Sequence, residues 1–243
     1  MIRDLSLNNE LFGTVALVTT SGSFSYPSSA VPDASNQAIY FTGLDSTRAG
    51  VFIVSAGGGN ATALFTGAPF SRPLDLALST DNQTLFIADS GAGAIYSMSI
   101  GGGMPVIVPG TAGTAPVALE VIRRGGQDQI YFCGSNPGDG QAAVFEIASG
   151  GAASPILRHK GVPLVAPAGI VSATDGTLFI ADGGGKVHKL TSAGAITQLA
   201  NGIIMGSPAG IALTPDDHVL AVSSKSSGNG TAQVQLIDLQ SGE

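Results

Sequence analysis

The stretch Pro167-Ala168-Gly169-Ile170-Val171 decides the fold, together with the turn Thr174-Asp175-Gly176 and the strand core Leu178-Phe179-Ile180 that follow it. The same order occurs five times: a proline, a short apolar run, a turn, an aliphatic–aromatic strand core and a glycine-rich break. The prolines that begin the repeats are Pro27, Pro73, Pro116, Pro167 and Pro208, and they lie 46, 43, 51 and 41 residues apart. The chain is therefore an array of similar repeats.

A repeat of about 40 to 50 residues with four short strands is typical of a β-propeller, in which each repeat forms one blade. The inner strands read as continuous apolar runs, as expected of strands that are covered on both faces. The sequence predicts an all-β fold with five four-stranded blades in a single propeller domain over residues 1–243. A six-bladed or a truncated propeller is the alternative.

The fifth repeat lacks its last strand, because residues 240–243 fall inside the glycine-rich break. Residues 14–19 read as a strand, and Leu17 precedes Pro27 by ten residues. The leucines of complete repeats precede the next proline by a similar distance: nine residues for Leu64, ten for Leu157 and nine for Leu199. We therefore expect residues 14–19 to pair with residues 234–237, which closes the propeller and removes an open sheet edge.

Composition narrows the classes of partner. The chain has 17 acidic and 10 basic residues, a net charge of −7, and its bases are scattered. Nucleic-acid binding needs a basic stripe, so it is not expected. No apolar stretch approaches the ~18 to 20 residues that cross a bilayer, and Asp4 interrupts any signal-peptide core. We expect a soluble protein, either cytoplasmic or exported with its leader removed.

Two strand cores end in an aspartate. Residues 84–91 read Thr-Leu-Phe-Ile-Ala-Asp-Ser-Gly, and residues 177–183 read Thr-Leu-Phe-Ile-Ala-Asp-Gly. With Pro-Ala-Gly-Ile at 167–170 and 208–211, this phrase resembles the NHL repeat, which NHL-type and gluconolactonase-type propellers share. We interpret Asp89 and Asp182 as turn residues that accept hydrogen bonds from nearby backbone N–H groups, rather than as catalytic residues.

The resemblance to gluconolactonase-type hydrolases implies a divalent cation, such as calcium, held at the propeller axis by Glu, Asn and Asp side chains. Asp75 and Glu120 are the acids of the predicted inner strands and are the two weak metal candidates. No inner-strand Asn or His completes a ligand set. We therefore predict no metal, no cofactor and no catalytic residue, and we favour a structural role in which Asp75 accepts a hydrogen bond from Arg72 or from the backbone.

We call the strands of each blade a to d, from the inside outward. The loops between strands b and c and between strands d and a share one face, and the longest repeat carries its insertion there, at residues 135–140. Insertions on one face of a repeat array usually mark the binding face. The predicted ligand-binding face comprises Arg72, Asp75, Asn136 and Asp139.

Two classes of function remain open from the sequence. The first is a non-enzymatic NHL-type propeller that binds a protein or a small-molecule ligand on the loop face and serves as a scaffold. The alternative is a metal-dependent lactonase or related hydrolase of gluconolactonase type, acting at the propeller axis. The first is favoured because the inner strands supply too few candidate ligands for a hard cation.

Overall fold

The computed structural model describes residues 2–3, 18–19, 22, 24–150, 154–225 and 232–240. The chain divides into two compact units, Leu17–Lys160 and Gly161–Glu243, the latter together with Met1–Ala16. We call them the 17–160 unit and the 161–243 unit and describe each by itself. The described residues contain no helix, and thus none long and apolar enough to cross a membrane. A single domain over residues 1–243 stays a prediction.

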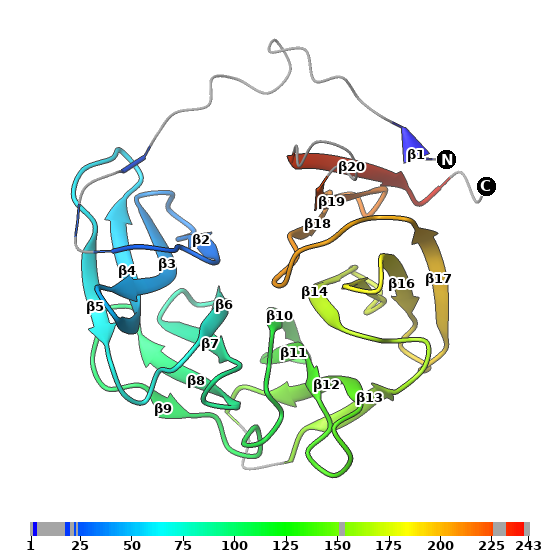
Figure 1. The fold of residues 1–243 in the computed structure, drawn as a ribbon, viewed down its shortest axis with the longest axis horizontal. Helices are drawn as coiled ribbons and strands as arrows, with labels where there is room; N and C mark the ends of the chain where they lie inside the picture. Colours follow the sequence, from blue (N-terminus) through cyan, green and yellow to red (C-terminus); the bar gives the residue numbers. More distant parts are fainter. Residues whose placement is uncertain are drawn as a thin grey trace. The chain divides into compact units, whose positions relative to one another are not determined.

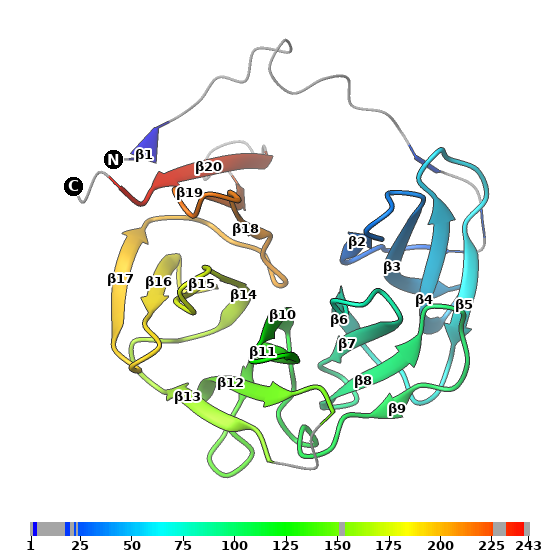
Figure 2. The ribbon, with the colours of Figure 1, turned by 180° about the vertical axis from the view of Figure 1, so that it is seen from behind.

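Three antiparallel four-stranded sheets form the 17–160 unit, and in each the strands neighbour one another in sequence order (Figures 1 and 2). Blade 1 consists of β2 (Ala30–Pro32), β3 (Ala38–Asp45), β4 (Arg48–Ser55) and β5 (Thr62–Thr66). Blade 2 consists of β6 (Pro73–Leu78), β7 (Thr84–Asp89), β8 (Ala94–Ser99) and β9 (Val106–Ile107). Blade 3 consists of β10 (Ala118–Arg124), β11 (Gln127–Ser135), β12 (Ala142–Ala148) and β13 (Ile156–Lys160).

Two further four-stranded sheets form the 161–243 unit. Blade 4 consists of β14 (Pro167–Ser172), β15 (Leu178–Asp182), β16 (Lys186–Leu190) and β17 (Ile196–Asn201). Blade 5 consists of β18 (Ile211–Leu213), β19 (Val219–Lys225), β20 (Ala232–Asp238) and the N-terminal strand β1 (Ile2–Arg3). Over the described residues, the prediction of an all-β propeller fold with five four-stranded blades is confirmed. An N-terminal strand does complete the last of them.

The residues that supply this strand differ from those predicted. Ile2 pairs with Ile237 and Arg3 pairs with Leu236, in antiparallel register. Val18 and Thr19 lie in no strand and belong to the 17–160 unit, while residues 14–17 fall outside the described residues. The expected pairing of residues 14–19 with residues 234–237 is therefore wrong for Val18 and Thr19, and β1 takes that place.

The distance match that led to residues 14–19 has a different physical origin. A Cβ placed on Gly58 would lie 3.0 Å from the carbonyl oxygen of Val18, and one on Gly102 would lie 3.4 Å from that of Leu64. Both glycines stand in the turn between strands c and d, in consecutive blades. Val18 and Leu64 each precede their repeat proline by nine residues. The conserved spacing within the chain thus reports a contact with the next blade's turn, not a pairing with β20.

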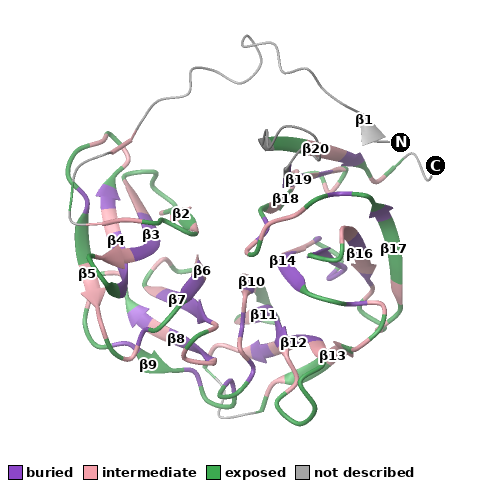
Figure 3. Ribbon diagram, viewed as in Figure 1, coloured by how far each residue is buried: buried purple, intermediate pink, exposed green. Residues whose placement is uncertain are grey.

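Alternate residues of the middle strands pack against different neighbouring blades. Leu85 and Ile87 of β7 belong to a core cluster with Tyr40 and Val51 of blade 1. The intervening Phe86 and Ala88 pack in a second cluster with residues of blade 3, among them Leu119, Ile130 and Phe132. Figure 3 shows the middle strands largely buried, whereas the outer strand β9 is exposed. This two-sided burial explains the uninterrupted apolar strand cores.

A hydrogen bond at the turn between strands a and b joins neighbouring blades at three places. The backbone N–H of Ala34 donates to Asn82 Oδ1 at 3.2 Å, that of Thr80 to Asp128 Oδ2 at 3.0 Å, and that of Thr174 to Asp217 Oδ2 at 2.9 Å. We call this contact the inter-blade clasp. In each pair the donor belongs to one blade and the acceptor to the next.

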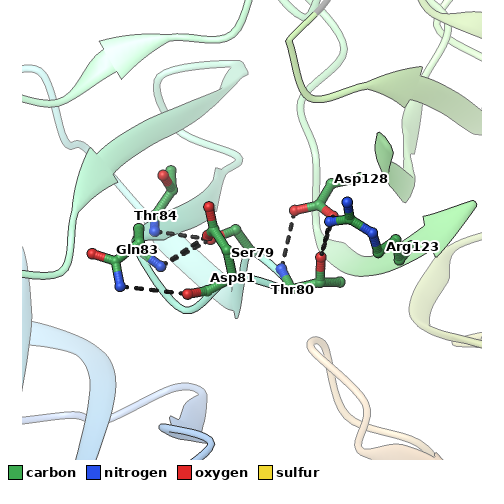
Figure 4. Close-up of polar contacts among 7 residues, drawn as sticks. All are labelled: Ser79, Thr80, Asp81, Gln83, Thr84, Arg123 and Asp128. Atoms are coloured by element: carbon green, nitrogen blue, oxygen red, sulfur yellow. Dashed lines mark hydrogen bonds and ion pairs between the residues drawn. The ribbon is translucent and has the colours of Figure 1, made fainter. Parts of the chain in front are cut away.

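The clasp between blades 2 and 3 is the most elaborate (Figure 4). The Thr80 hydroxyl also donates to Asp128 Oδ1, and Arg123 donates to Thr80 Oγ1 at 3.3 Å. The Asp128 side chain is only 10 % exposed. A nearly buried carboxylate that accepts two hydrogen bonds from a neighbouring blade should contribute measurably to stability.

We expect Asp128→Ala to lower the free energy of unfolding by about 2 kcal/mol, because it leaves the Thr80 N–H without its acceptor. Asp128→Asn should lose less than half of that amount, since its oxygen can accept from the N–H and its amide can donate to the Thr80 hydroxyl. Urea unfolding of the full chain measures both. Equal losses for the two variants would show that the clasp is not the source of the effect.

Candidate functional site

Four loops between strand d and the next strand a share one length and one pattern. They are residues 67–73, 110–116, 161–167 and 202–208, and each runs from a glycine to the repeat proline. The four glycines have positive φ, from +73° at Gly161 to +92° at Gly67, a conformation that other residues rarely adopt. The repeat prolines were recognisable in the sequence, but the glycine that stands six residues before four of them was not foreseen.

Asp89 fastens the first of these loops. Its side chain is fully buried and accepts hydrogen bonds from the backbone N–H groups of Ser71 and Arg72, both at 2.8 Å. It also accepts from Gly91 at 3.1 Å and Ala92 at 2.8 Å, in its own turn. The carboxylate therefore joins the turn between strands b and c to the loop before strand a, which confirms its structural role.

Asp182 does the same in blade 4. It is fully buried and accepts from the backbone N–H groups of Val165 and Ala166, both at 2.8 Å, and from that of Gly184 at 3.0 Å. His188 of β16 is also buried, with Nε2 3.6 Å from Asp182 Oδ2. Residues 187–190 read Val-His-Lys-Leu, and such apolar and basic residues are typical of a half-exposed strand, so the sequence does not indicate that this histidine is buried. We call each of these two carboxylate arrangements an aspartate latch.

The latches hold two exposed side chains in place on each loop. The residue before them, Phe70 or Leu164, is buried, and so is the proline after them, Pro73 or Pro167. Between these anchors Ser71 and Arg72 are exposed in one loop, and Val165 and Ala166 in the other. Because the backbone at these positions is tied down by a buried carboxylate, the side chains can differ without altering the loop. We call them the display positions.

Three of the four residues predicted to form the ligand-binding face lie on connected loops of the 17–160 unit. A Cβ on Gly91 would lie 2.8 Å from Arg72 Cβ, so the loop bearing Arg72 contacts the turn after β7. A Cβ on Gly93 of the same turn would lie 3.9 Å from the Gly113 nitrogen. A Cβ on Gly113 would lie 3.4 Å from the Cβ of Pro137, which follows Asn136 in the chain. The structure thus links Arg72 to the loop that carries Asn136 and Asp139 through one row of loop contacts.

The polar groups of this face differ in how far they are engaged. Asn136 Oδ1 accepts from the Gly138 N–H at 2.9 Å, and Asp139 forms an exposed ion pair with Lys160 at 2.7 Å. The hydrogen bond that Lys160 donates in this pair holds the pKa of Asp139 below its ordinary value. For the Arg72 guanidinium no hydrogen bond or ion pair occurs within the described part of the chain. Ligand binding by these residues stays a prediction.

Asp75 is placed differently from the other three. Its Oδ1 accepts from the Ser29 hydroxyl at 2.6 Å and from the Leu76 N–H at 2.9 Å, and its Oδ2 accepts from the Leu119 N–H at 2.9 Å. The donors come from blades 1, 2 and 3. Burial raises the pKa of the Asp75 carboxyl, and these hydrogen bonds act in the opposite sense. The expected backbone contact is present, but it is made to Leu76 and Leu119, not to Arg72.

Glu120, the second weak metal candidate, lies in β10 opposite Tyr131 of β11. No group of three or more His, Cys, Asp or Glu side chains that could hold a metal ion occurs among the residues that the structure describes. Asp75 and Glu120 therefore have no third ligand of these types in the described chain. The two acids remain the positions to examine if the purified protein carries metal.

Comparison with known proteins supports the fold and nothing finer. No family model matches the chain, and no curated protein sequence matches it. A nidogen/laminin complex has a similar structure, with TM-score 0.71 and 16% identity over 89% of this chain and 77% of that one. PQQ-bound aldose sugar dehydrogenase from Streptomyces coelicolor gives TM-score 0.65 and 14% identity, over 91% and 81%.

A third similar structure is the inactive H270A virginiamycin B lyase from Staphylococcus aureus with quinupristin. Its TM-score is 0.57 with 16% identity, over 92% of this chain and 73% of that one. At these identities the likeness defines a class of fold: the chain is a β-propeller. Because enzymes and a protein complex stand side by side among the similar structures, the class does not by itself choose an activity.

Proposed function

We propose that this chain is a non-enzymatic β-propeller that binds a protein or small-molecule ligand through the loops at one end of its blades. The observation that carries the proposal is the aspartate latch, which fixes the backbone of the display positions while their side chains vary from Ser71 and Arg72 to Val165 and Ala166. Rigid loops that present different side chains are suited to recognition, because little conformational freedom is lost on binding.

The metal-dependent lactonase is less well supported. Its strongest candidate ligand, Asp75, already accepts three hydrogen bonds, and these use both of its oxygens. A hard cation needs several oxygen ligands that are free to turn toward it. Rearranging Asp75 would leave the N–H groups of Leu76 and Leu119 without acceptors, at the junction of three blades.

Elemental analysis and lactone hydrolysis test the choice of class. We expect the purified full chain to hold calcium, magnesium and zinc at well below one equivalent. We also expect that it shows no chelator-sensitive hydrolysis of simple lactones. The expectation follows from the donor set around Asp75 and Glu120. One equivalent of metal together with chelator-sensitive turnover would overturn the proposal and make these two acids ligands.

Selection from a displayed random-peptide library on the immobilised full chain tests the binding face. Peptides that recognise the loops should lose about tenfold or more in affinity with Arg72→Ala or Asp139→Ala. The matched control is Gln83→Ala, which removes an exposed polar side chain from the turn between strands a and b, at the opposite end of β7. Selected peptides that all bind Arg72→Ala and Asp139→Ala as they bind the parent would contradict the proposed face.

A further inference from the structure

An exposed apolar patch lies on the loops of the 161–243 unit. It comprises Val162, Val165 and Ile204, whose side chains are 88 %, 69 % and 45 % exposed. The two loops that carry them meet over one glycine turn. A Cβ on Gly184 would lie 3.4 Å from Val165 Cβ, and a Cβ on Gly185 would lie 3.3 Å from the Ile203 carbonyl oxygen. A Cβ at either position would contact the neighbouring loop tightly, and Gly185 also has a positive φ of +83°, so glycines suit this close approach.

The backbone beneath the patch is fixed. Val165 is held through its N–H by the Asp182 latch, as described above. On the other loop Ile203 is fully buried, and its N–H donates to the Gly185 carbonyl oxygen at 3.1 Å. The exposed side chains therefore stand on anchored backbone. Covering them with a partner removes apolar surface from water at a low cost in ordering.

The charge of the patch differs from that of the chain. Residues 161–167, 183–186 and 202–208 contain no Asp or Glu, and Lys186 is their one charged residue, in a chain of net charge −7. Lys186 follows Gly185 directly and is half-exposed. Asp182, at the start of the turn, is buried and accepts the hydrogen bonds of the latch. An acidic partner would therefore be attracted by Lys186, and these loops have no exposed carboxylate that would repel it.

We propose that this patch binds an acidic, apolar peptide segment of a partner protein, with aliphatic or aromatic side chains on Val165 and Ile204 and a carboxylate at Lys186. The inference rests on the binding role proposed above, but it uses residues other than Arg72, Asn136 and Asp139. Exposed apolar side chains gathered on two adjoining loops are typical of a protein interaction site, and the positive charge of Lys186 favours a partner with acidic side chains.

Three fluorescent peptides with the same leucine and phenylalanine content, and with acidic, neutral or basic flanking residues, are the probes. Fluorescence anisotropy with the full chain should show the acidic peptide binding most tightly. Val165→Asp should weaken it by about tenfold or more, whereas Val106→Asp, at an exposed valine of β9 in the other unit, should leave it unchanged. Lys186→Glu should reverse the order, so that the basic peptide binds more tightly than the acidic one.

Val162→Asp provides a second disruption of the patch should Val165→Asp unfold, and urea midpoints verify that each variant is folded. Equal binding of the acidic and basic peptides, or unchanged binding by both aspartate variants, would overturn the inference. Failure of the inference and failure of the proposed function are distinguishable. If only the inference fails, the peptides selected from the library still lose affinity with Arg72→Ala or Asp139→Ala. If the proposed function itself fails, the full chain holds one equivalent of metal and hydrolyses lactones in a chelator-sensitive way.

Discussion

Replacing Asp182 by alanine should lower the free energy of unfolding by about 3 to 5 kcal/mol. Asp182 is fully buried and accepts from the N–H groups of Val165, Ala166 and Gly184 at 2.8 to 3.0 Å. Hydrogen bonds to a charged acceptor are stronger than neutral ones, and their removal leaves three donors without that acceptor.

Urea unfolding of the full chain measures the loss, and Asp175→Ala is the matched control. Asp175 is an exposed turn aspartate that accepts, within the described part of the chain, from the N–H and hydroxyl of Thr177, so its removal should cost about 1 kcal/mol. Hydrogen exchange adds a local readout, because the amides of Val165 and Ala166 should lose protection in Asp182→Ala. Unchanged protection there would mean that the loop is held by other contacts. In Asp89→Ala, the amides of Ser71 and Arg72 should likewise lose protection from hydrogen exchange.

The latch shows which part of such a site is predictable. The aspartate after the strand core indicated a turn that binds its own backbone, because the bonds to Gly91 and Ala92 are local in sequence. Its other partners, Ser71 and Arg72, lie 18 and 17 residues earlier in the chain, on the loop before strand a. No propensity or spacing rule connects them, since the contact exists only after blade 2 has formed.

Asp75 marks a second limit of the sequence. Asp75 stands two residues after its repeat proline, where two sister repeats have Gly169 and Gly210, so an acid is unusual at this position of the repeat. The two partners that the sequence did not indicate, Ser29 and Leu119, come from the neighbouring repeats. One signal was available: Ser29 and Asp75 each stand two residues after their repeat proline, so polar side chains occupy the same position in consecutive blades.

The sequence predicted that an N-terminal strand completes the last blade, but it did not indicate which residues form that strand. A repeat array without its last strand d implied that a segment from the other end of the chain completes it. Among the described residues, Ile2 and Arg3 are the two that pair with β20, and two residues are too few to show a hydrophobic period. Residues 14–19 carried the stronger pattern, and for Val18 and Thr19, which the structure describes, the predicted pairing is wrong.

Replacing Asp75 by alanine should lower the free energy of unfolding by about 2 to 4 kcal/mol at neutral pH. The substitution takes the acceptor from Leu119 N–H in blade 3 and from Leu76 N–H in blade 2, and it breaks the bond with Ser29 of blade 1. Unlike the latch, this carboxylate joins three blades. Its loss should therefore weaken the packing between blades more than it alters any single loop.

The pH dependence of Asp75 has a definite sign. Burial raises its pKa in the folded chain, so the folded state holds the proton more tightly than the unfolded state. The part of its contribution to stability that depends on protonation is then complete below the unfolded pKa of about 3.9 and is lost as the pH rises through the folded pKa. Relative to Asp75→Asn, which does not titrate, the parent chain should gain stability as the pH falls from neutral toward about 4.

Asp33 provides the control of opposite sign. Hydrogen bonds from the Ser35 hydroxyl and from backbone N–H groups lower its pKa, so its contribution is present above the unfolded pKa and is lost as the pH falls through the folded one. Urea midpoints of the parent, Asp75→Asn and Asp33→Asn between neutral pH and about pH 3 compare the two, because the contribution of Asp33 is lost mainly below its unfolded pKa of about 3.9. The stability advantage of the parent over Asp33→Asn should shrink on acidification. If the advantage of the parent over Asp75→Asn shrinks as well, then the hydrogen bonds outweigh burial in setting the pKa of Asp75. Asp75 would in that case be a stabilising ionised junction between the blades.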